Sequence, residues 1–331
     1  MNVKEQVLET LEKQKGEHIS GGQLAAALGV SRNAVWKAVK SLQEEGYSIS
    51  AITNKGYCME RENDILSVQS ISKYLLPELS FLNLEVHKTI DSTNTRAKEY
   101  AAQGRAEGMV VIAEEQTAGR GRMGRSFYSP SSSGVYISFL MRPDFTAQES
   151  LFLTTAAAVA AAQAIEEVAE TEAVIKWVND VFCHGKKVCG ILTEASVNVE
   201  NSMLEYAVTG IGFNLWEPEG GFPKEIQSVA GSVFQQKKDK QNISEAEIRS
   251  KIVASMINHF WEYYEHLTEK SFMAEYKRRS FLIGKEVYTV SDTPITGTAV
   301  DIDDDGHLIL ECQDGKRIAL SSGEVSVRPV S

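Results

Sequence analysis

A stretch in which glycine and arginine alternate, Gly119 to Arg125, constrains the fold of this chain more than any other feature. Its three glycines let a backbone approach a ligand closely, and its three arginines carry planar, permanently charged groups that suit carboxylates and phosphates. Apolar, β-branched runs stand on both sides of it, at 110–113 and 135–140. We therefore expect a loop between two strands that holds an anion, with a phosphoryl group as the best match.

The order strand, loop, strand excludes several familiar phosphate sites. The glycines also satisfy G-x-G-x-x-G, but the dinucleotide-binding form of that motif needs a helix directly after the loop. A protein-kinase glycine loop does lie between strands, yet the sequence contains neither H-R-D nor D-F-G. A Walker A motif is also missing. The remaining alternative is a basic hairpin loop that binds no ligand.

Length and composition describe an ordinary globular protein. A chain of 331 residues suggests two or three domains, and 43% apolar and 24% charged residues are typical values. The four cysteines lack the spacing of metal ligands, which predicts reduced thiols, a cytoplasmic location and no metal site built from protein ligands. No apolar run appears long enough to span a bilayer, so no membrane partner is expected.

Charge is unevenly distributed along the chain. The net charge of −11 disfavours indiscriminate binding to nucleic acid. Residues 1–60, however, contain seven basic and seven acidic side chains, so the remaining residues carry the whole excess. This difference predicts a separate N-terminal module.

The N-terminal module has the pattern of a winged helix-turn-helix. Ser20 begins a capping box ahead of a short helix, and Ser31 can cap a longer helix that extends to about Glu45. A short helix, a glycine turn and a longer helix are typical of the helix-turn-helix motif. Residues 47–50 and 53–57 then predict two short strands, which would form the wing.

One face of the third predicted helix is polar and basic, which suits entry into the major groove and contact with flanking phosphates. The alternative is a helical domain for protein contacts, with Trp36 in its core. The candidate DNA-binding residues are Ser31, Arg32, Asn33, Trp36, Lys37 and Lys40 in this helix, and Lys55 in the wing.

The remaining pattern predicts a multidomain α+β protein. We expect a winged helix-turn-helix over residues 1–63, a mixed α/β domain over 64–281 and a small β-barrel over 282–331, with a linker near 60–64. In the middle domain, helices are expected near 67–76, 94–103, 149–170 and 244–268, and strands near 83–88, 109–116, 134–141, 173–177, 187–195 and 203–213.

Four further segments combine polar residues with strand or helix ends. Asp91–Asn94 precedes a predicted helix, and the alternative for it is an ordinary N-cap. Lys176–Asp180 closes a strand, and the alternative for it is an ordinary Asx turn. The lysines at 186–187 could be merely solvated at a hairpin turn. The glycines within 209–215 could mark a bulge or close strand packing.

Together these segments resemble the family of bifunctional biotin–protein ligases that also repress the biotin operon, over essentially the whole chain. The resemblance rests on the winged helix, Asp91–Asn94, Glu115–Arg125, Lys176–Asp180, Lys187–Glu194 and Gly210–Asn214. It implies a class II synthetase-like catalytic domain and an SH3-like C-terminal barrel. Two positions depart from the family pattern: Val178 replaces the usual proline, and Phe127 replaces a frequent tryptophan but still offers an aromatic face.

The resemblance implies a two-step reaction. Biotin attacks the α-phosphate of ATP, bound with Mg²⁺, to give biotinyl-5′-AMP, and a lysine of a biotin carboxyl carrier domain then takes the biotinyl group. It implies catalytic roles for Lys187, Arg122 and Asp180. The implied biotin-binding residues are Ser92, Thr93, Asn94, Gln116, Gly119, Arg120 and Lys187. The implied ATP- or adenylate-binding residues are Arg122, Arg125, Phe127, Lys176, Asn179 and Asn214.

The resemblance also implies partners. These are the carrier domain, operator DNA and a second copy of the chain, with the segment 217–232 becoming ordered over adenine. Two other functions stay open at this point: a lipoate-type acyl ligase of similar fold, and a ligand-sensing transcription factor without catalysis.

Overall fold

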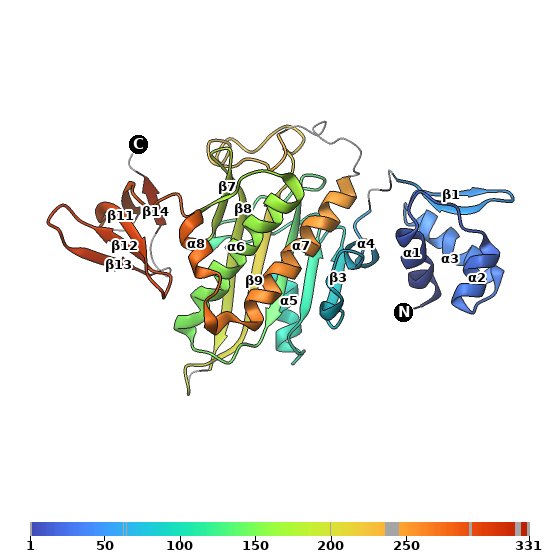
Figure 1. The fold of residues 1–331 in the computed structure, drawn as a ribbon, viewed down its shortest axis with the longest axis horizontal. Coiled ribbons are helices and arrows are strands. Elements are labelled where there is room, and N and C mark those ends of the chain that lie inside the picture. Colours follow the sequence, from blue (N-terminus) through green and yellow to red (C-terminus); the bar gives the residue numbers. More distant parts are fainter. Residues whose placement is uncertain are drawn as a thin grey trace. The chain divides into compact units, whose positions relative to one another are not determined.

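The computed structural model describes residues 2–61, 63, 65–198, 200–235, 245–290, 293–321 and 326–329. It divides into two compact units, each described here by itself (Figure 1). The first comprises Met1–Ser80 and Lys240–Ala254, and the second comprises Phe81–Asp239 and Ser255–Ser331.

The first unit contains the predicted winged helix-turn-helix. Its elements are α1 (Val3–Lys13), α2 (Gly21–Leu28), α3 (Arg32–Glu44), β1 (Ile49–Ile52) and β2 (Gly56–Met59). The apolar faces of all five meet in one core, to which Leu8, Leu24, Val39 and Met59 contribute. β1 and β2 pair antiparallel and form the two-stranded wing.

The predicted helix caps are confirmed. Ser20 and Gln23 make both hydrogen bonds of a capping box at the start of α2. Gly29 ends that helix in the left-handed conformation, with φ of 64°, which glycine adopts without steric cost. The Ser31 hydroxyl accepts a hydrogen bond from the Ala34 N–H at the start of α3. The turn between the two helices is therefore determined by local sequence.

Two features of the first unit differ from the sequence prediction. The expected linker includes Asn63, which is buried and accepts a hydrogen bond from the Ser48 N–H, so part of it packs on the module. The single helix expected at 67–76 is instead α4 (Val68–Ser72) and a 3-10 turn, η1 (Pro77–Leu79). Proline disfavours a helical conformation in the residue before it, and Leu76 is extended, with ψ of 138°.

A seven-stranded sheet forms the centre of the second unit, with the strand order β3-β4-β5-β9-β8-β7-β6. β3 and β4 pair parallel, and every other neighbouring pair is antiparallel. The strands are β3 (Asn83–His87), β4 (Met109–Ala113), β5 (Gly134–Met141), β6 (Val174–Lys176), β7 (Asp180–Cys183), β8 (Lys186–Val197) and β9 (Leu204–Asn214). The sequence analysis missed β7 and extended β4 three residues too far.

Helices cover both faces of this sheet. α6 (Ser150–Ala169) and the second half of α7 (Glu245–Glu265) lie side by side over one face (Figure 1), where the rings of Phe139 and Phe260 are 4.7 Å apart. α5 (Thr93–Ala102) packs on the other face through Ala97 and Ala101. The glycine–arginine loop also lies on the α5 side, because its contacts described below are with residues of that face.

α6 corrects one expectation. By length and composition it could cross a membrane, since an 18-residue window has a mean hydropathy of 1.3. However, 72% of that window is buried inside the structure. A helix that is apolar all round and enclosed by its own domain is typical of a globular core.

The C-terminal region begins with η4 (Leu267–Glu269) and α8 (Met273–Arg279), a helix that the sequence analysis missed. A five-stranded antiparallel sheet follows, in the order β13-β12-β11-β10-β14. Its strands are β10 (Glu286–Val290), β11 (Thr296–Ile302), β12 (Leu308–Glu311), β13 (Arg317–Leu320) and β14 (Ser326–Pro329). The small β domain is confirmed; among the described residues no pairing joins β13 to β14, so closure into a barrel stays a prediction.

Candidate active site

Three glycines on neighbouring strands form the floor of the candidate site. Gly190 pairs with Gly212, and Gly210 lies two residues along the same strand. A Cβ on Gly212 would lie 2.5 Å from the ring of Phe127, and one on Gly210 would lie 2.0 Å from Oδ1 of Asn94. These positions therefore require glycine, because only a strand without side chains lets the loop and the start of α5 pack directly on the sheet.

The glycine–arginine loop is folded back on itself above this floor. The Gly121 N–H donates to the Arg125 carbonyl at 2.7 Å, and the Phe127 N–H donates to the Gly119 carbonyl at 2.9 Å. Between them, η2 (Arg122–Gly124) makes a tight turn. The loop is a structured hairpin that presents arginine side chains toward the sheet.

The loop, the start of α5 and the glycine floor enclose a cleft with a cavity of about 170 Å³. Eleven of the predicted site residues line it: Ser92, Thr93, Asn94, Gln116, Arg120, Arg122, Arg125, Phe127, Asn179, Asp180 and Lys187. Gly119 lines an adjoining hollow beneath the same loop. Lys176 and Asn214 are not in the lining of either.

Neutral polar groups are concentrated at one end of the cleft. The N–H and hydroxyl of Thr93 lie 2.8 and 3.1 Å from Oε1 of Gln116. The hydroxyl of Ser138 lies 2.6 Å from Oδ1 of Asn94 and 2.7 Å from the Thr93 hydroxyl. Ser92 is the N-cap of α5. The N-cap alternative thus explains Ser92 and leaves Thr93 and Asn94 as parts of a fixed hydrogen-bonding row.

Cations and one acid meet at the other end. Nζ of Lys187 lies 2.6 Å from Oδ1 of Asp180, and Nη1 of Arg122 donates to Oδ1 of Asn179 at 3.0 Å. Burial lowers the pKa of Arg122, and the nearby Asp180 carboxylate opposes that shift. Arg122 and Lys187, which are far apart in the sequence, thus line the same partly buried part of the cleft.

Asn179 is hydrogen-bonded to the neighbouring strand β8, so it does more than close an Asx turn. Its backbone carbonyl accepts from the Ile191 N–H at 2.9 Å, and its Nδ2 donates to the Ile191 carbonyl at 2.7 Å. Residues 177–179 connect β6 to β7, so this attachment places Asn179 and Asp180 beside Lys187. The Trp177–Val178 peptide bond, where the family pattern usually has proline, is cis.

Glu194 belongs to the site but was missed by the sequence analysis. Its carboxylate accepts from Nδ2 of Asn94 at 2.9 Å and from Nζ of Lys98 at 2.8 Å, and it lies 3.4 Å from Nη1 of Arg120. Burial alone would raise the pKa of Glu194, but the hydrogen bonds from Lys98 and Asn94 lower it overall. Strand alternation from Gly190 through position 192 could have identified it.

Residues 229–231, which follow β9, make backbone hydrogen bonds with Lys187. The Lys187 N–H donates to the Val229 carbonyl at 2.8 Å, and the Gly231 N–H donates to the Lys187 carbonyl at 2.9 Å. The backbone on either side of the Lys187 side chain is thus held between β7 and residues 229–231. Ordering of the segment 217–232 over a nucleotide stays a prediction.

The candidate DNA-binding residues lie together in the first unit. Trp36 is 49% exposed, with Nζ of Lys40 5.5 Å from its ring centre, so it is not part of the core. The Ser31 hydroxyl is used to cap α3, although the residue itself is exposed. The other members of the set are also exposed: Arg32, Asn33, Lys37, Lys40 and Lys55.

The described part of the chain contains no group of three or more His, Cys, Asp or Glu side chains that could hold a metal ion. The cysteines are free thiols, and Cys58, Cys183 and Cys189 are buried.

Three regions of the chain match known protein families. Residues 86–214 match the biotin/lipoate A/B protein ligase family, residues 3–58 match an HTH domain, and residues 282–328 match the biotin protein ligase C-terminal domain. The chain is 35% identical over 314 residues to the bifunctional ligase/repressor BirA of Bacillus subtilis, covering 95% of both chains. It is 28% identical over 320 residues to BirA of Escherichia coli, covering 95% of this chain and 94% of that one.

A solved structure shows the same architecture. Biotin protein ligase from Aquifex aeolicus, in complex with biotin and ATP, is 29% identical, with a TM-score of 0.61. The match covers 76% of this chain and all of that one.

Proposed function

Because the chain belongs to the family of bifunctional biotin ligase/repressor proteins, we propose that its glycine-floored cleft joins biotin to AMP and passes the biotinyl group to a carrier lysine. One observation carries this proposal. A row of neutral hydrogen-bonding groups and a pair of cations, Arg122 and Lys187, line the same narrow cleft. Such a cleft matches a ligand with a polar ring at one end and a carboxylate at the other.

The neutral end suits the ring system of biotin. A ureido ring offers one carbonyl acceptor and two N–H donors, and Ser92, Thr93 and Gln116 supply fixed partners for both kinds of group. Asn94 contacts the ring from a side chain that Ser138 and Glu194 already orient. Backbone groups of Gly119 and Arg120 complete this end, and the apolar chain of biotin lies along Ile191 and Leu192.

The charged end suits the first chemical step. A carboxylate oxygen of biotin attacks the α-phosphorus of ATP, the bond to pyrophosphate breaks, and pyrophosphate leaves. Both reactants are anions, so fixed cations must offset their repulsion as charge develops. Lys187 lies between the carboxylate and the α-phosphate, and Arg122 lies over the adenylate and retains it.

The nucleotide occupies the space beside the loop. Arg125 contacts its phosphates, the ring of Phe127 offers a face to adenine, and Asn179 adds a polar contact. Lys176 and Asn214 contact a nucleotide that extends past the cleft lining.

Mg²⁺ enters with ATP in this proposal. Asp180 is the acidic side chain in the cleft lining, and the triphosphate would supply the oxygen ligands of the ion. The ion adds positive charge to the phosphates.

In the second step the amine of a carrier lysine attacks the acyl carbon of biotinyl-5′-AMP. An amide forms, AMP leaves, and the amine gives up a proton. Asp180, the acid beside the reacting group, orients the incoming amine. The carrier partner is therefore a biotin carboxyl carrier domain that presents an exposed lysine.

The first unit carries the repressor function. It binds operator DNA in the cytoplasm. The exposed residues of α3 enter the major groove, and Lys55 in the wing contacts the backbone. Two copies of the chain, paired as a homodimer, would read the two halves of a palindromic operator. If the adenylate orders loops at the subunit interface, it favours the dimer and so favours DNA binding, since coupling of this kind is reciprocal.

Exchange of labelled pyrophosphate into ATP tests the enzymatic proposal. The first step is reversible, so we expect exchange with biotin, and less than about 1% of that rate with lipoate or with no acid. Exchange supported equally by lipoate would favour the lipoate-type ligase. Absence of exchange with every acid would favour a sensor that binds ligand without catalysis.

A further inference from the structure

Two buried hydrogen bonds hold the segment that carries Asn179 and Asp180, and both come from residues outside the cleft. The Tyr276 hydroxyl, on α8, donates to the Val178 carbonyl at 2.9 Å. The Trp177 Nε1–H donates to the Gly306 carbonyl at 3.0 Å. The Tyr276 side chain is fully buried, and Trp177 is nearly so.

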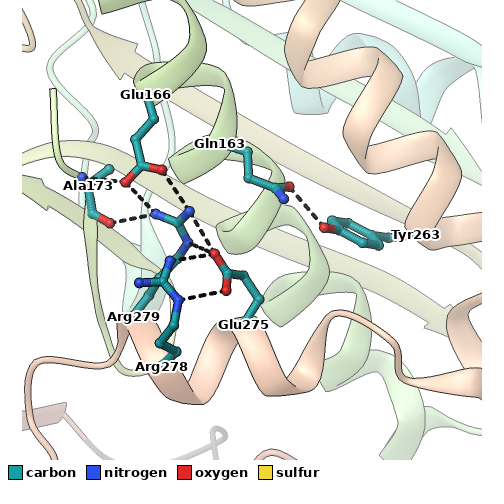
Figure 2. Close-up of polar contacts among 7 residues, drawn as sticks. All are labelled: Gln163, Glu166, Ala173, Tyr263, Glu275, Arg278 and Arg279. Carbon is teal, nitrogen blue, oxygen red and sulfur yellow. Dashed lines mark hydrogen bonds and ion pairs between the residues drawn. The ribbon is translucent and has the colours of Figure 1, made fainter. Parts of the chain in front are cut away.

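Several hydrogen bonds hold α8 in place, and they therefore also hold Tyr276, which lies on this helix. Figure 2 shows the Arg279 guanidinium between Glu166 of α6 and Glu275 of α8. It donates to both oxygens of Glu166, at 2.6 and 2.8 Å, and to the Ala173 carbonyl at 2.9 Å. The Phe281 N–H, just after the helix, donates to the Ile175 carbonyl at 3.2 Å. These bonds anchor α8 to α6 and to β6.

The phenol of Tyr276 also lies close to the charged end of the cleft. Burial raises its pKa, the Asp180 carboxylate raises it further, and the Arg122 guanidinium opposes the shift. The hydroxyl therefore stays a neutral donor at every pH at which the enzyme would work. A neutral, permanent donor is suited to holding a backbone carbonyl in place.

We propose that Tyr276 is a positioning residue for adenylate formation, which it supports by fixing the Val178 carbonyl and thereby the two residues that follow. Asn179 accepts from Arg122, and Asp180 pairs with Lys187. A shift of this carbonyl would move both cations relative to the reacting atoms. The inference rests on the proposed function and names a residue that touches no substrate.

The hydrogen bond from Tyr276 matters because the carbonyl that accepts it is buried. A buried carbonyl that loses its donor is left unsatisfied, and the local backbone moves to regain a partner. A misplacement of about 1 Å in a catalytic group can reduce turnover on the order of 100-fold. Since only one hydrogen bond is removed here, we expect a smaller effect, of about tenfold.

Tyr276→Phe tests the proposal, because it keeps the buried ring and removes only the donor. Tyr263→Phe is the matched control: it removes a hydrogen bond of 3.0 Å to Gln163, also shown in Figure 2, within the same unit but outside the cleft lining. We expect Tyr276→Phe to lower kcat for biotin-dependent pyrophosphate exchange about tenfold, with KM for biotin changed less than about twofold. Tyr263→Phe should keep wild-type kcat at a similar loss of Tm.

The outcomes separate the two proposals. Wild-type protein without biotin-dependent exchange would remove the proposed function. Active wild-type protein together with unchanged kcat in Tyr276→Phe would overturn the positioning role alone. An equal loss of kcat in Tyr263→Phe would also overturn it, since the effect would then follow stability in general.

A double-mutant cycle with Asn179→Ala adds a second readout. If Tyr276 acts through this segment, Tyr276→Phe should reduce kcat by a smaller factor in the Asn179→Ala background than in the wild type, because part of its effect passes through Asn179. Multiplication of the two separate losses would show that Tyr276 acts elsewhere and would overturn the proposal. If Tyr276→Phe does not fold, Trp177→Phe removes the other hydrogen bond to the segment. It should lower kcat in the same way, and wild-type kcat in this variant would overturn the proposal.

Discussion

Lys187, the lysine that we propose for adenylate formation, is held in place by one acidic neighbour. Its side chain is 26% exposed and that of Asp180 is 23% exposed, so the ion pair between them is only partly buried. Pairs of this kind contribute little to stability, because water screens them. The value of the pair lies in holding one ammonium group at a fixed place beside the glycine floor.

Replacement of this lysine tests its role directly. We expect Lys187→Ala to lower the rate of pyrophosphate release about 100-fold or more, since a fixed cation at developing charge contributes on this scale. Lys186→Ala is the control, because the neighbouring ammonium group donates to the Ser228 carbonyl and does not line the cleft. A Lys187→Ala enzyme that releases pyrophosphate at the wild-type rate would contradict the assignment.

The sequence predicted those site residues whose motifs combine unusual residue types. Glycine alternating with arginine rarely has a purely structural reason, whereas a hydroxyl at a helix start is often only an N-cap, as at Ser20 and Ser31. Glu194 lies in the recognised segment Lys187–Glu194 but was given no role, because an acid within a strand often faces solvent. Asn214 was predicted from its motif, but it lies two residues beyond Gly212, past the cleft lining. Motif membership thus indicates the site, while the register of β9 determines its extent.

Among the elements of the fold, α8 and β7 were the hardest to predict. Each is short, with seven and four residues, and each gains its stability from tertiary contacts. α8 is held by Arg279, whose side chain is 5% exposed, between Glu166 and Glu275. The helices α2 and α3 were predicted well, because their apolar periodicity and caps are local.

The contribution of Arg279 can be measured against its neighbour. Arg279→Met should lower the free energy of unfolding by about 3 kcal/mol, near the low end for a buried pair because Glu166 is one-third exposed. Arg278→Met should lower it much less, since that side chain is 64% exposed and water screens its ion pair. Urea titrations of both variants measure the difference, and equal losses would refute the structural role of α8 described here.

The same cluster has a defined pH dependence. The hydrogen bond from Arg278, with the Arg279 charge, lowers the pKa of Glu275 to about 2, and Arg279 lowers the pKa of Glu166. Both carboxylates are therefore more acidic in the folded state, so their stabilisation is present above pH 4.5 and is lost as pH falls toward 2. The stability difference between wild type and Arg279→Met should shrink over that window, and a constant difference would contradict this account.

For the molecule as a whole, charge and function are divided between parts of the chain. The net charge of −11 resides outside the neutral first 60 residues, so overall charge does not attract DNA, and we propose that the exposed face of α3 provides specific binding. The sequence already indicated a separate N-terminal module, because its charge balance differs from that of the remaining chain and its helix caps can be identified from local residues. The C-terminal sheet was visible only as a series of short strands, and its strand order required the structure.

We propose that ligand binding in the cleft is linked to operator binding, because one chain carries both functions. We expect biotin with ATP to tighten binding to an operator fragment selected from random-sequence DNA by about tenfold or more. Gel-shift titrations with and without both ligands measure this, and Arg32→Ala should weaken binding in both conditions without changing pyrophosphate exchange. Equal affinity with and without the ligands would show that the two functions are independent.

The central claim is that one cleft brings a carboxylate and a nucleotide together and retains their product. Native mass spectrometry of the full chain, mixed with biotin, ATP and Mg²⁺, tests it most directly. The account predicts one biotinyl-5′-AMP retained per chain, and none when either biotin or ATP is omitted. A chain that binds both ligands but retains them only as separate, unjoined molecules would contradict it.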